Sequence, residues 1–435
     1  MIMAHCRHLP AQHEDLMKDQ SKADVVVIGG GIIGCMAARY LIEAGRRVTI
    51  LERSAIAAGA SAGNAGILAF PEIVPIPAPG ITWKAPGWLL DPLGPLAIRP
   101  AYAARLAPWL WHFWQASSRA SFERGLKVQA AMMRLAAAEY ETVRKDARLA
   151  SFIVNTGTLD LYDSEKSFAA ATPDWARKRE AGFDFHRVGR GEIETLQPGL
   201  APQFEHAIYS EDGLQVSDPA GFTRALAESL REDGVTITIG EAAALEPTEA
   251  GARIRLADGG VLEARTVVVA CGAWSKTLAK SLGEAVPLDT ERGYNTTLPA
   301  TAFPLKRQLY FNDHSFVVTP LKAGIRVGGA VEFGGLDLPA NFKRAEALLT
   351  LAKRFLPGLE TEGGEQWMGF RPSMPDCLPV IDRSKAAPNV LYAFGHGHLG
   401  LTQSAATARL IAELAGQQKP SVNLENLRFD RFSGW

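Results

Sequence analysis

The chain has 435 residues, of which 47% are hydrophobic and 21% are charged, and its formal net charge is −1. This composition is typical of a globular protein with two or three cores, and the near-zero charge argues against nucleic-acid binding. No apolar run is long enough to span a membrane. The four cysteines form neither a C-x-x-C pair nor a zinc-binding spacing, which favours a reducing, cytoplasmic compartment.

The first 22 residues are polar and lack the apolar centre of a secretory signal. We expect them to form a tail ahead of the first strand. Three histidines and Cys6 lie in this tail, so a metal site is the alternative interpretation. The tail is favoured, and no metal site is predicted.

A nucleotide-binding unit is predicted over Ala23–Arg53. The β-branched run Val25–Ile28 predicts a strand that is buried on both faces. A helix is predicted next, at Ile32–Glu43. It ends before Gly45, and glycine is the residue type most often found directly after a helix C-terminus. Val48–Leu51 is then expected as a second, parallel strand.

A G-x-G-x-x-G turn joins the first strand to this helix. Gly29 permits the tight turn, Gly31 lets a pyrophosphate approach the backbone, and Gly34 lets the helix pack close to the strand. The helix N-terminus offers N–H groups to phosphates, and Glu52 stands where a carboxylate can bind an adenosine ribose. The order of these elements predicts a dinucleotide site without separating NAD from FAD.

Two unusual stretches follow the second strand. Positions 57–68 are rich in glycine and small residues, which favours a backbone lying against a flat ligand over a simple flexible loop. Pro71–Pro100 holds too many prolines for a long regular element.

Two helices are predicted over Tyr102–Ala150, the second at Glu123–Lys145. Aromatic residues near the end of the first helix are expected to be core: Trp109, Trp111, Phe113 and Trp114. The alternative is a membrane-surface or partner-docking patch, to which the preceding Trp83 and Trp88 would also belong.

The rest of the chain alternates between strands and helices. Strands are predicted at Phe152–Tyr162, Phe183–Val188, Ala207–Tyr209, Val235–Ile239, Ala252–Leu256, Val261–Ala264, Thr266–Ala270, Gly293–Leu298, Leu309–Phe311, Phe316–Pro320, Ile325–Gly329 and Val390–Phe394. Helices are predicted at Pro173–Glu180, Ser217–Glu232, Phe342–Phe355 and Leu401–Leu414.

The nucleotide-type elements occur in three separate stretches, which predicts an α/β fold with a doubly wound, Rossmann-type domain interrupted by insertions. A second domain with a mixed β-sheet should roof the first and hold the substrate. The expected boundaries are 23–85, 205–285 and 365–420 for the nucleotide domain, 86–204 and 286–364 for the substrate domain, 1–22 for the tail and 421–435 for a C-terminal segment.

In its motifs the chain resembles the D-amino-acid oxidase superfamily of flavoproteins, and within it bacterial D-amino-acid dehydrogenases and similar hydroxy-D-proline dehydrogenases. The resemblance covers nearly everything from Ala23 onward. It is carried by Gly29–Gly34 with Glu52-Arg53, the run Ser61–Gly66, Pro95–Arg99, Arg292-Gly293-Tyr294, Gly369–Pro372 and Gly395–Thr402.

The resemblance implies FAD as the cofactor. Some related amine oxidases attach the flavin through a cysteine near Arg371, but Cys377 does not stand at the matching position, so non-covalent FAD is expected. The loop at Gly395–Gly400 is expected at the flavin pyrimidine end. The cofactor-binding residues that the resemblance implies are Gly29, Gly31, Ile32, Ile33, Gly34, Glu52, Arg53, Ser61, Asn64, Ala65, Gly66, Ile67, Ala270, Gly272, Trp274, Gly395, His396, His398, Leu399, Gly400, Leu401 and Thr402.

An amino-acid substrate needs a fixed cation for its carboxylate, and the resemblance places Arg371 in this role, with Tyr294 and Arg292 as further candidates. A salt bridge from Arg371 to Asp376 is the alternative. His396 and His398 are interpreted as loop residues beside the flavin and not as a metal pair.

Three functions are compatible with these features. The first is a D-amino-acid dehydrogenase, acting on an open-chain or cyclic substrate such as D-proline or hydroxy-D-proline, which transfers hydride from Cα to flavin N5 and passes electrons to quinone or another acceptor. The second is a glycine- or sarcosine-type oxidase that uses oxygen, and the third is a flavin subunit of a larger electron-transfer complex. A cytoplasmic location is expected, with possible contact to the inner face of the membrane or to a partner subunit.

Overall fold

The strand predicted at Val25–Ile28 lies inside a mixed sheet, between two parallel neighbours. The computed structural model describes residues 23–81, 87, 94 and 96–432. The strands of this first sheet are β1 (Ala23–Ile28), β2 (Val48–Glu52), β9 (Thr236–Ile239), β10 (Ala242–Thr248), β11 (Gly251–Leu256), β12 (Val261–Val269), β18 (Val380–Arg383) and β19 (Val390–Phe394). Across the described residues they form one eight-stranded sheet in the order β10-β11-β12-β1-β2-β9, with β19 beside β12 and β18 beside β19.

Both faces of the first sheet are covered, as the β-branched sequence of β1 predicts. Val25 and Val27 face a core that includes residues of α2 (Ile32–Glu43), α5 (Arg119–Val143), α8 (Pro219–Glu232) and α11 (Gly400–Ala415). Val26 and Ile28 face a second core that includes α9 (Ser275–Ser281). The doubly wound domain expected from the sequence is therefore confirmed.

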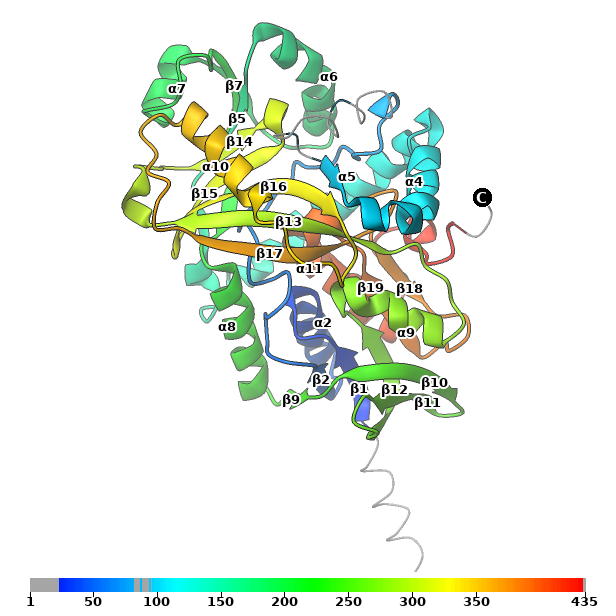
Figure 1. The fold of residues 1–435 in the computed structure, drawn as a ribbon. Helices are drawn as coiled ribbons and strands as arrows, with labels where there is room; N and C mark the ends of the chain where they lie inside the picture. The colour runs from blue at the N-terminus through cyan, green and yellow to red at the C-terminus, as the bar shows by residue number, and fades with distance from the viewer. Residues whose placement is uncertain (1–22, 82–86, 88–93, 95, 433–435) are drawn as a thin grey trace, which may run out of the picture.

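The second sheet roofs the first (Figure 1). It contains β3 (Leu96–Ile98), β5 (Thr158–Tyr162), β6 (His186–Gly189), β7 (His206–Ser210), β13 (Asp289–Leu298), β14 (Gln308–Phe311), β15 (Phe316–Leu321), β16 (Gly324–Phe333) and β17 (Glu365–Ser373). The order is β17-β13-β16-β15-β14-β5-β7-β6, with β3 on β16, among the described strands. Helix α10 (Lys343–Phe355) packs on this sheet through Leu348, Leu351 and Phe355.

Short elements tie the two sheets together. The strands β4 (Ile153–Asn155) and β8 (Leu214–Val216) pair with each other, and the glycine-rich loop after β2 is bound to β8. Leu68 N donates to Leu214 O at 3.1 Å, and Val216 N donates to Gly66 O at 2.7 Å. The loop that should lie against a flat ligand is thereby held in one position from behind.

Several predicted elements differ in extent from the structure. The strand predicted at Phe152–Tyr162 divides into β4 and β5 because Gly157 has a φ of +67°. The two strands predicted at 261–270 are one continuous β12. Helix α6 (Glu165–Glu180) begins eight residues before Pro173, because Ser164 and Ser167 form a capping box that starts it earlier. Strand β10 and the short helix α7 (Arg190–Leu196) were not predicted.

The two helices predicted after the proline-rich stretch are α4 (Ala103–Ala116) and α5. The aromatic residues of α4 divide between core and surface. Trp109 is buried, whereas Trp111 and Trp114 expose 54% and 53% of their surface and stack on each other at 4.9 Å. Trp83 and Trp88 lie outside the described residues. Among the helices that the structure describes, none has the length and apolar character needed to cross a bilayer.

Candidate active site

The glycine turn has the geometry that binds a pyrophosphate. Gly29 adopts a φ of +117°, and a Cβ on Gly34 would lie 1.9 Å from the carbonyl oxygen of Gly29. Gly31 is the N-cap of α2 and supplies no side-chain cap, and Ile32 N donates to Ser61 Oγ at 3.0 Å. Apart from Ile32 N, the first turn of α2 therefore presents backbone N–H groups without a side-chain cap.

The acid at the end of β2 is held in a fixed position. Glu52 Oε2 accepts from Gly30 N at 2.7 Å, and its Oε1 accepts from Ser54 N at 3.0 Å. Beside it, the Arg53 guanidinium stacks 3.6 Å above the Trp274 ring. These side chains form a charged and aromatic wall at the nucleotide end of the site.

A cavity of about 970 Å³ runs from the glycine turn to the roofing sheet. Nearly all residues predicted from the sequence to bind the cofactor line it: Gly29, Gly31, Ile32, Ile33, Glu52, Arg53, Ser61, Asn64, Ala65, Ile67, Ala270, Gly272, Trp274, His396, His398, Leu399, Gly400, Leu401 and Thr402. Stretches that are far apart in the sequence therefore meet around one volume, which is large enough for a cofactor and a small substrate.

Three predicted cofactor residues, Gly34, Gly66 and Gly395, are not among the residues that line the cavity. A Cβ on Gly34 would collide with Gly29, one on Gly66 would lie 2.4 Å from Val216 O, and one on Gly395 would lie 2.7 Å from Met374. Gly66 and Gly395 also have positive φ angles. The structure gives these glycines a role in close backbone packing, and their contact with the cofactor stays a prediction.

The roofing sheet presses an indole onto the loop at 61–67. Trp367 fills the space that a Cβ on Gly63 or Gly369 would need, at 2.1 and 1.9 Å from its ring. Asn295 Nδ2 donates to Gly63 O at 2.9 Å, and Arg326 Nη1 donates to Asn64 O at 2.5 Å. Neither Trp367 nor Arg326 could be predicted from the sequence, because both come from the roofing sheet, more than 250 residues after the loop.

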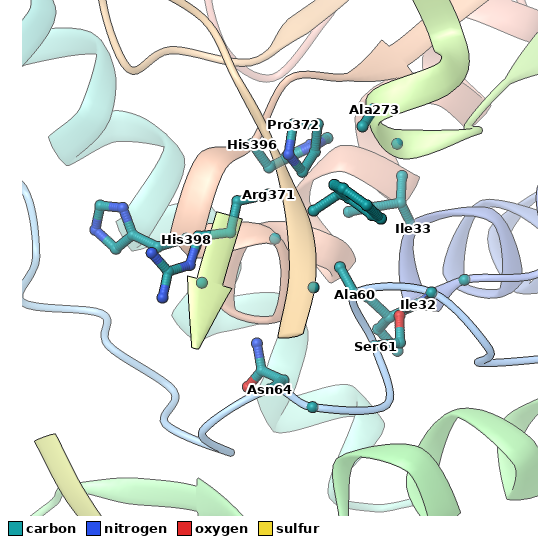
Figure 2. Close-up of a pocket in the computed structure, with 18 of the residues that line it drawn as sticks. Ile32, Ile33, Ala60, Ser61, Asn64, Ala273, Arg371, Pro372, His396 and His398 are labelled. Atoms are coloured by element: carbon teal, nitrogen blue, oxygen red, sulfur yellow. Dashed lines mark hydrogen bonds between the residues drawn. The ribbon is translucent and has the colours of Figure 1, made fainter. Parts of the chain in front are cut away.

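Arg371 lies in the cavity on β17, on the side away from Ile32, Ile33 and Ser61 (Figure 2). Its Nη1 donates to Ala330 O at 3.1 Å and its Nη2 to Gly329 O at 3.2 Å. Burial lowers the pKa of the guanidinium, while the charge of Glu291 acts in the opposite direction. Two carbonyls thus fix the group and leave other N–H donors for a ligand.

The alternative salt bridge from Arg371 to Asp376 is not formed. Asp376 is instead held by Arg431, whose Nε and Nη2 lie 2.7 and 2.8 Å from its carboxylate oxygens. Among the residues that the structure describes, no carboxylate comes within ion-pair distance of Arg371. Within the described residues, the Arg371 guanidinium therefore faces the cavity without an ion-pair contact.

Arg292 and Tyr294 do not take the positions predicted for substrate binding. Arg292 is fully buried outside the cavity, and its guanidinium donates to carbonyl oxygens of Gly334, Gly335, Leu338 and Pro339 and contacts Glu332. Tyr294 borders the cavity, but its hydroxyl donates to Glu332 Oε1 at 2.9 Å and accepts from Asn341 N. Arg292 is therefore a structural residue of the roof.

Sequence reasoning missed two acids and a tyrosine that line the cavity, namely Glu291, Glu72 and Tyr310. Glu291 is directly opposite Arg371 in the pairing of β13 with β17. Glu72 Oε2 lies 3.7 Å from Lys178 Nζ, and Tyr310 neighbours Asp160 in the pairing of β14 with β5. The alternation of residues along β13 could have indicated Glu291. Glu72 could not be found in this way, because it lies in the proline-rich stretch, where no regular element is predicted.

The two histidines of the last loop are neutral residues in the site. Burial lowers the pKa of His396 to about 3, and its Nε2 lies 2.9 Å from Thr407 Oγ1. Burial also lowers the pKa of His398, which lies on the same side of the cavity as Arg371 (Figure 2). No group of three metal-ligating side chains occurs within the described ranges.

The residues of the cavity fit FAD. Two helix N-termini without side-chain caps, those of α2 and α11, border it, and a fixed carboxylate stands at the end of β2. The first suits the pyrophosphate, the carboxylate suits the ribose, and the second helix suits the electron-rich end of a reduced flavin ring. The cysteines of the cavity region offer no ready attachment, because burial raises the pKa of the Cys271 thiol to about 12 and that of Cys377 well above its usual value.

Comparison with known proteins agrees with this cofactor. Residues 24–414 match the model of the DAO family, described as FAD dependent oxidoreductase. The chain is 31% identical to a D-amino-acid oxidase of Bradyrhizobium diazoefficiens over 94% of this chain and 98% of that one. It is also 31% identical to a D-amino acid dehydrogenase of Agrobacterium fabrum, over 94% and 100% of the two chains.

Solved structures show the same fold. A glycine oxidase from Geobacillus kaustophilus superposes with a TM-score of 0.73 at 21% identity, covering 94% of this chain and 99% of that one. The family match, the two relatives and the residues around the cavity lead to one assignment. This chain belongs to the DAO family of FAD-dependent oxidoreductases, and FAD is its cofactor.

Proposed function

We propose that this protein is an FAD-dependent D-amino-acid dehydrogenase, which oxidises the amine at the substrate Cα and passes the electrons to quinone or another acceptor. The observation that carries the proposal is Arg371, a cation that faces the cavity and forms no ion pair within the described residues. A ligand carboxylate is the group that such a cation suits best. Both relatives at 31% identity are named for D-amino acids, which supports the stereochemistry.

Bound FAD supplies the acceptor for the hydride that leaves the substrate Cα. The protein has to bind, orient and shield the substrate. Arg371 can bind both carboxylate oxygens through its planar fork and so fix Cα against the ring. Trp367 and strands of the roofing sheet line the cavity on the side away from the glycine turn. The imine product then hydrolyses to a keto acid and ammonia, or remains as a cyclic imine when the substrate is a ring.

The substrate side chain is expected to extend toward Glu72 and Tyr310. Glu72 borders the cavity beside Lys178, and Tyr310 borders it through an aromatic ring with a hydroxyl. These groups can accept and donate hydrogen bonds, which suits a polar side chain or a ring hydroxyl. We therefore propose that D-proline and hydroxy-D-proline are among the substrates.

The deciding experiment is a substrate screen of the purified flavoprotein. D- and L-amino acids and cyclic imino acids are supplied with an artificial dye as acceptor, and peroxide is measured in parallel in air-saturated buffer. Dye reduction with D-amino acids and little peroxide is expected. Stoichiometric peroxide would favour the oxidase alternative, and an isolated chain inactive with every amino acid would favour a flavin subunit that needs its complex.

We also propose that α4 contacts the membrane surface, where a quinone would be reached. Trp111 and Trp114 are exposed and stacked, and positions 92–122 contain three arginines and neither aspartate nor glutamate. Exposed tryptophans flanked by arginine suit the headgroup region of an anionic bilayer.

Cosedimentation with phosphatidylglycerol vesicles tests this contact. The native chain should bind these vesicles, and Trp111→Ser with Trp114→Ser should lose most of the binding. Ile239→Ser with Val261→Ser, which changes exposed apolar residues at the other end of the molecule, is the control. If the native chain and the double variant sediment equally little, the face does not bind membranes and a partner subunit becomes its candidate.

A further inference from the structure

Glu291 is a buried carboxylate with no protein partner. It exposes only 8% of its surface and lines the cavity, yet within the part of the chain that the structure describes its carboxylate forms no hydrogen bond or ion pair. The other buried glutamates are all bound by protein groups. Glu284 binds Ser384 and Tyr392, Glu332 binds Arg292 and Tyr294, and Glu413 binds Arg409 and Ser421.

The register of the roofing sheet puts Glu291 beside Arg371. The two residues are direct partners in the antiparallel pairing of β13 with β17, so their side chains leave the sheet on the same face. Gly293, the next residue on that face, has no side chain, and the Arg371 guanidinium lies over it, within 2.5 Å of the place of a Cβ. Arg371 therefore leans away from Glu291 along the strand, and each group keeps its own part of the cavity.

A buried carboxylate without a partner is costly, and the cost is recovered when a cation binds it. An amino acid carries a carboxylate and an ammonium group on the same carbon. A cation and an anion fixed side by side on one wall are complementary to that pair of charges. Within the described residues, neither group forms an ion pair that would satisfy it.

Resting on the proposed function, we propose that Glu291 is the subsite for the ammonium group of the substrate and accepts a proton from it. The N–H⁺ proton passes to a Glu291 carboxylate oxygen and leaves a neutral amine. The Cα–H bond then breaks with its electron pair going to FAD, and the nitrogen lone pair forms the C=N bond. The product is an iminium ion, and Glu291 retains one proton that solvent later removes.

The charged and titratable groups that face Glu291 come from each element packed against it. They are Arg371 on β17, His398 in the last loop and Cys377 after β17, which all interact electrostatically with Glu291. Burial lowers the pKa of the His398 imidazole and raises that of the Cys377 thiol. Glu291 is therefore the group in this cluster that can carry a proton away from an ammonium ion.

The test compares two ligands that cannot be oxidised. 2-Aminoisobutyrate carries both charges but has no hydrogen on Cα, and isobutyrate has the carboxylate alone. Binding to the FAD-loaded protein is followed by the change in flavin absorbance. The native protein should bind 2-aminoisobutyrate more tightly than isobutyrate, and Glu291→Gln should reduce this preference by about 10- to 100-fold, the loss of a charge-assisted hydrogen bond.

Two variants make the result specific. Arg371→Ala should weaken both ligands, and Glu365→Gln, on the exposed end of β17, should change neither. With a true substrate, Glu291→Gln should also regain activity at a pH where the free amine is abundant. Glu291→Asp, which keeps the charge, should restore part of the preference and serves if the amide variant loses FAD.

The outcomes separate the two proposals. If the native protein binds neither ligand, and oxidises no amino acid, the proposed function is wrong. If it binds both ligands and Glu291→Gln keeps the native preference for 2-aminoisobutyrate, only the ammonium subsite is wrong.

Discussion

Replacing Arg371 should remove substrate binding without removing the cofactor. The guanidinium donates one N–H to Ala330 O and one to Gly329 O, which leaves three of its five donors for a substrate carboxylate. Removing one partner of a buried charge pair costs about 2–5 kcal/mol. Arg371→Ala should therefore lower kcat/KM by about 30- to 5000-fold, because each 1.4 kcal/mol is a factor of ten.

The assay is steady-state dye reduction with the best D-amino acid, combined with the flavin-to-protein absorbance ratio. The flavin ratio should remain native, because Arg371 lies on the side of the cavity away from the glycine turn (Figure 2). Arg371→Lys should recover only part of the loss, since an ammonium group cannot match both carboxylate oxygens. Arg307→Ala, which removes a guanidinium bound to a backbone carbonyl outside the cavity, is the control. Native kcat/KM in Arg371→Ala would refute the assignment.

Three further outcomes test other parts of the structure. Glu52→Ala should weaken FAD retention on gel filtration, because the carboxylate fixed at the end of β2 loses its ribose contact. Gly293→Ala should lower kcat/KM at least tenfold, because its Cβ would lie 2.5 Å from an Arg371 nitrogen. Gly191→Ala is the control and should leave kcat/KM unchanged, because the space around Gly191 is open. Equal activity of the two variants would contradict the placement of Arg371. Burial raises the pKa of Asp160 from 3.8 to about 6, so the folded state binds this proton more tightly and the free energy of unfolding falls as pH rises from 4 toward 7. Asp160→Asn should therefore be more stable than the native chain by about 2–3 kcal/mol at pH 8 and similar at pH 3.5 in urea unfolding, whereas an unchanged pH slope would exclude this cause.

The nucleotide end of the molecule could be predicted from the sequence because its chemistry is local. The first strand, glycine turn, helix and acid follow one another within Ala23–Arg53, and the predicted contacts within that unit depend on little else. Even there, Gly34 serves the packing of α2 on β1 and does not line the cavity. A motif indicates which residues are needed and does not separate contact with a ligand from contact with the backbone.

The substrate end could be predicted only in part, because it is assembled from strands of the roofing sheet. Arg371 was found through its family motif, and Arg292 was expected beside it. Residues alternate between the two faces of a strand, so Arg292 lies on the face opposite to Glu291. The choice between these two neighbours depends on which face of β13 meets the cavity. That choice is made by the packing of α10 and β16, which the local sequence does not reveal.

The pairing of β1 also constrains how the chain matures during synthesis. β1 leaves the ribosome early, but its neighbour β12 follows about 240 residues later, and β19 and α11 come from the last part of the chain. β2 follows β1 closely, but the other edge of this apolar strand must stay without its partner while the intervening elements are made. A product stopped after residue 380 would have the glycine turn but neither β19 nor the helix that packs on α2. We therefore expect FAD to bind only after synthesis of the chain is complete. Truncated chains should lack FAD and should be cleaved by proteases more readily than the full chain.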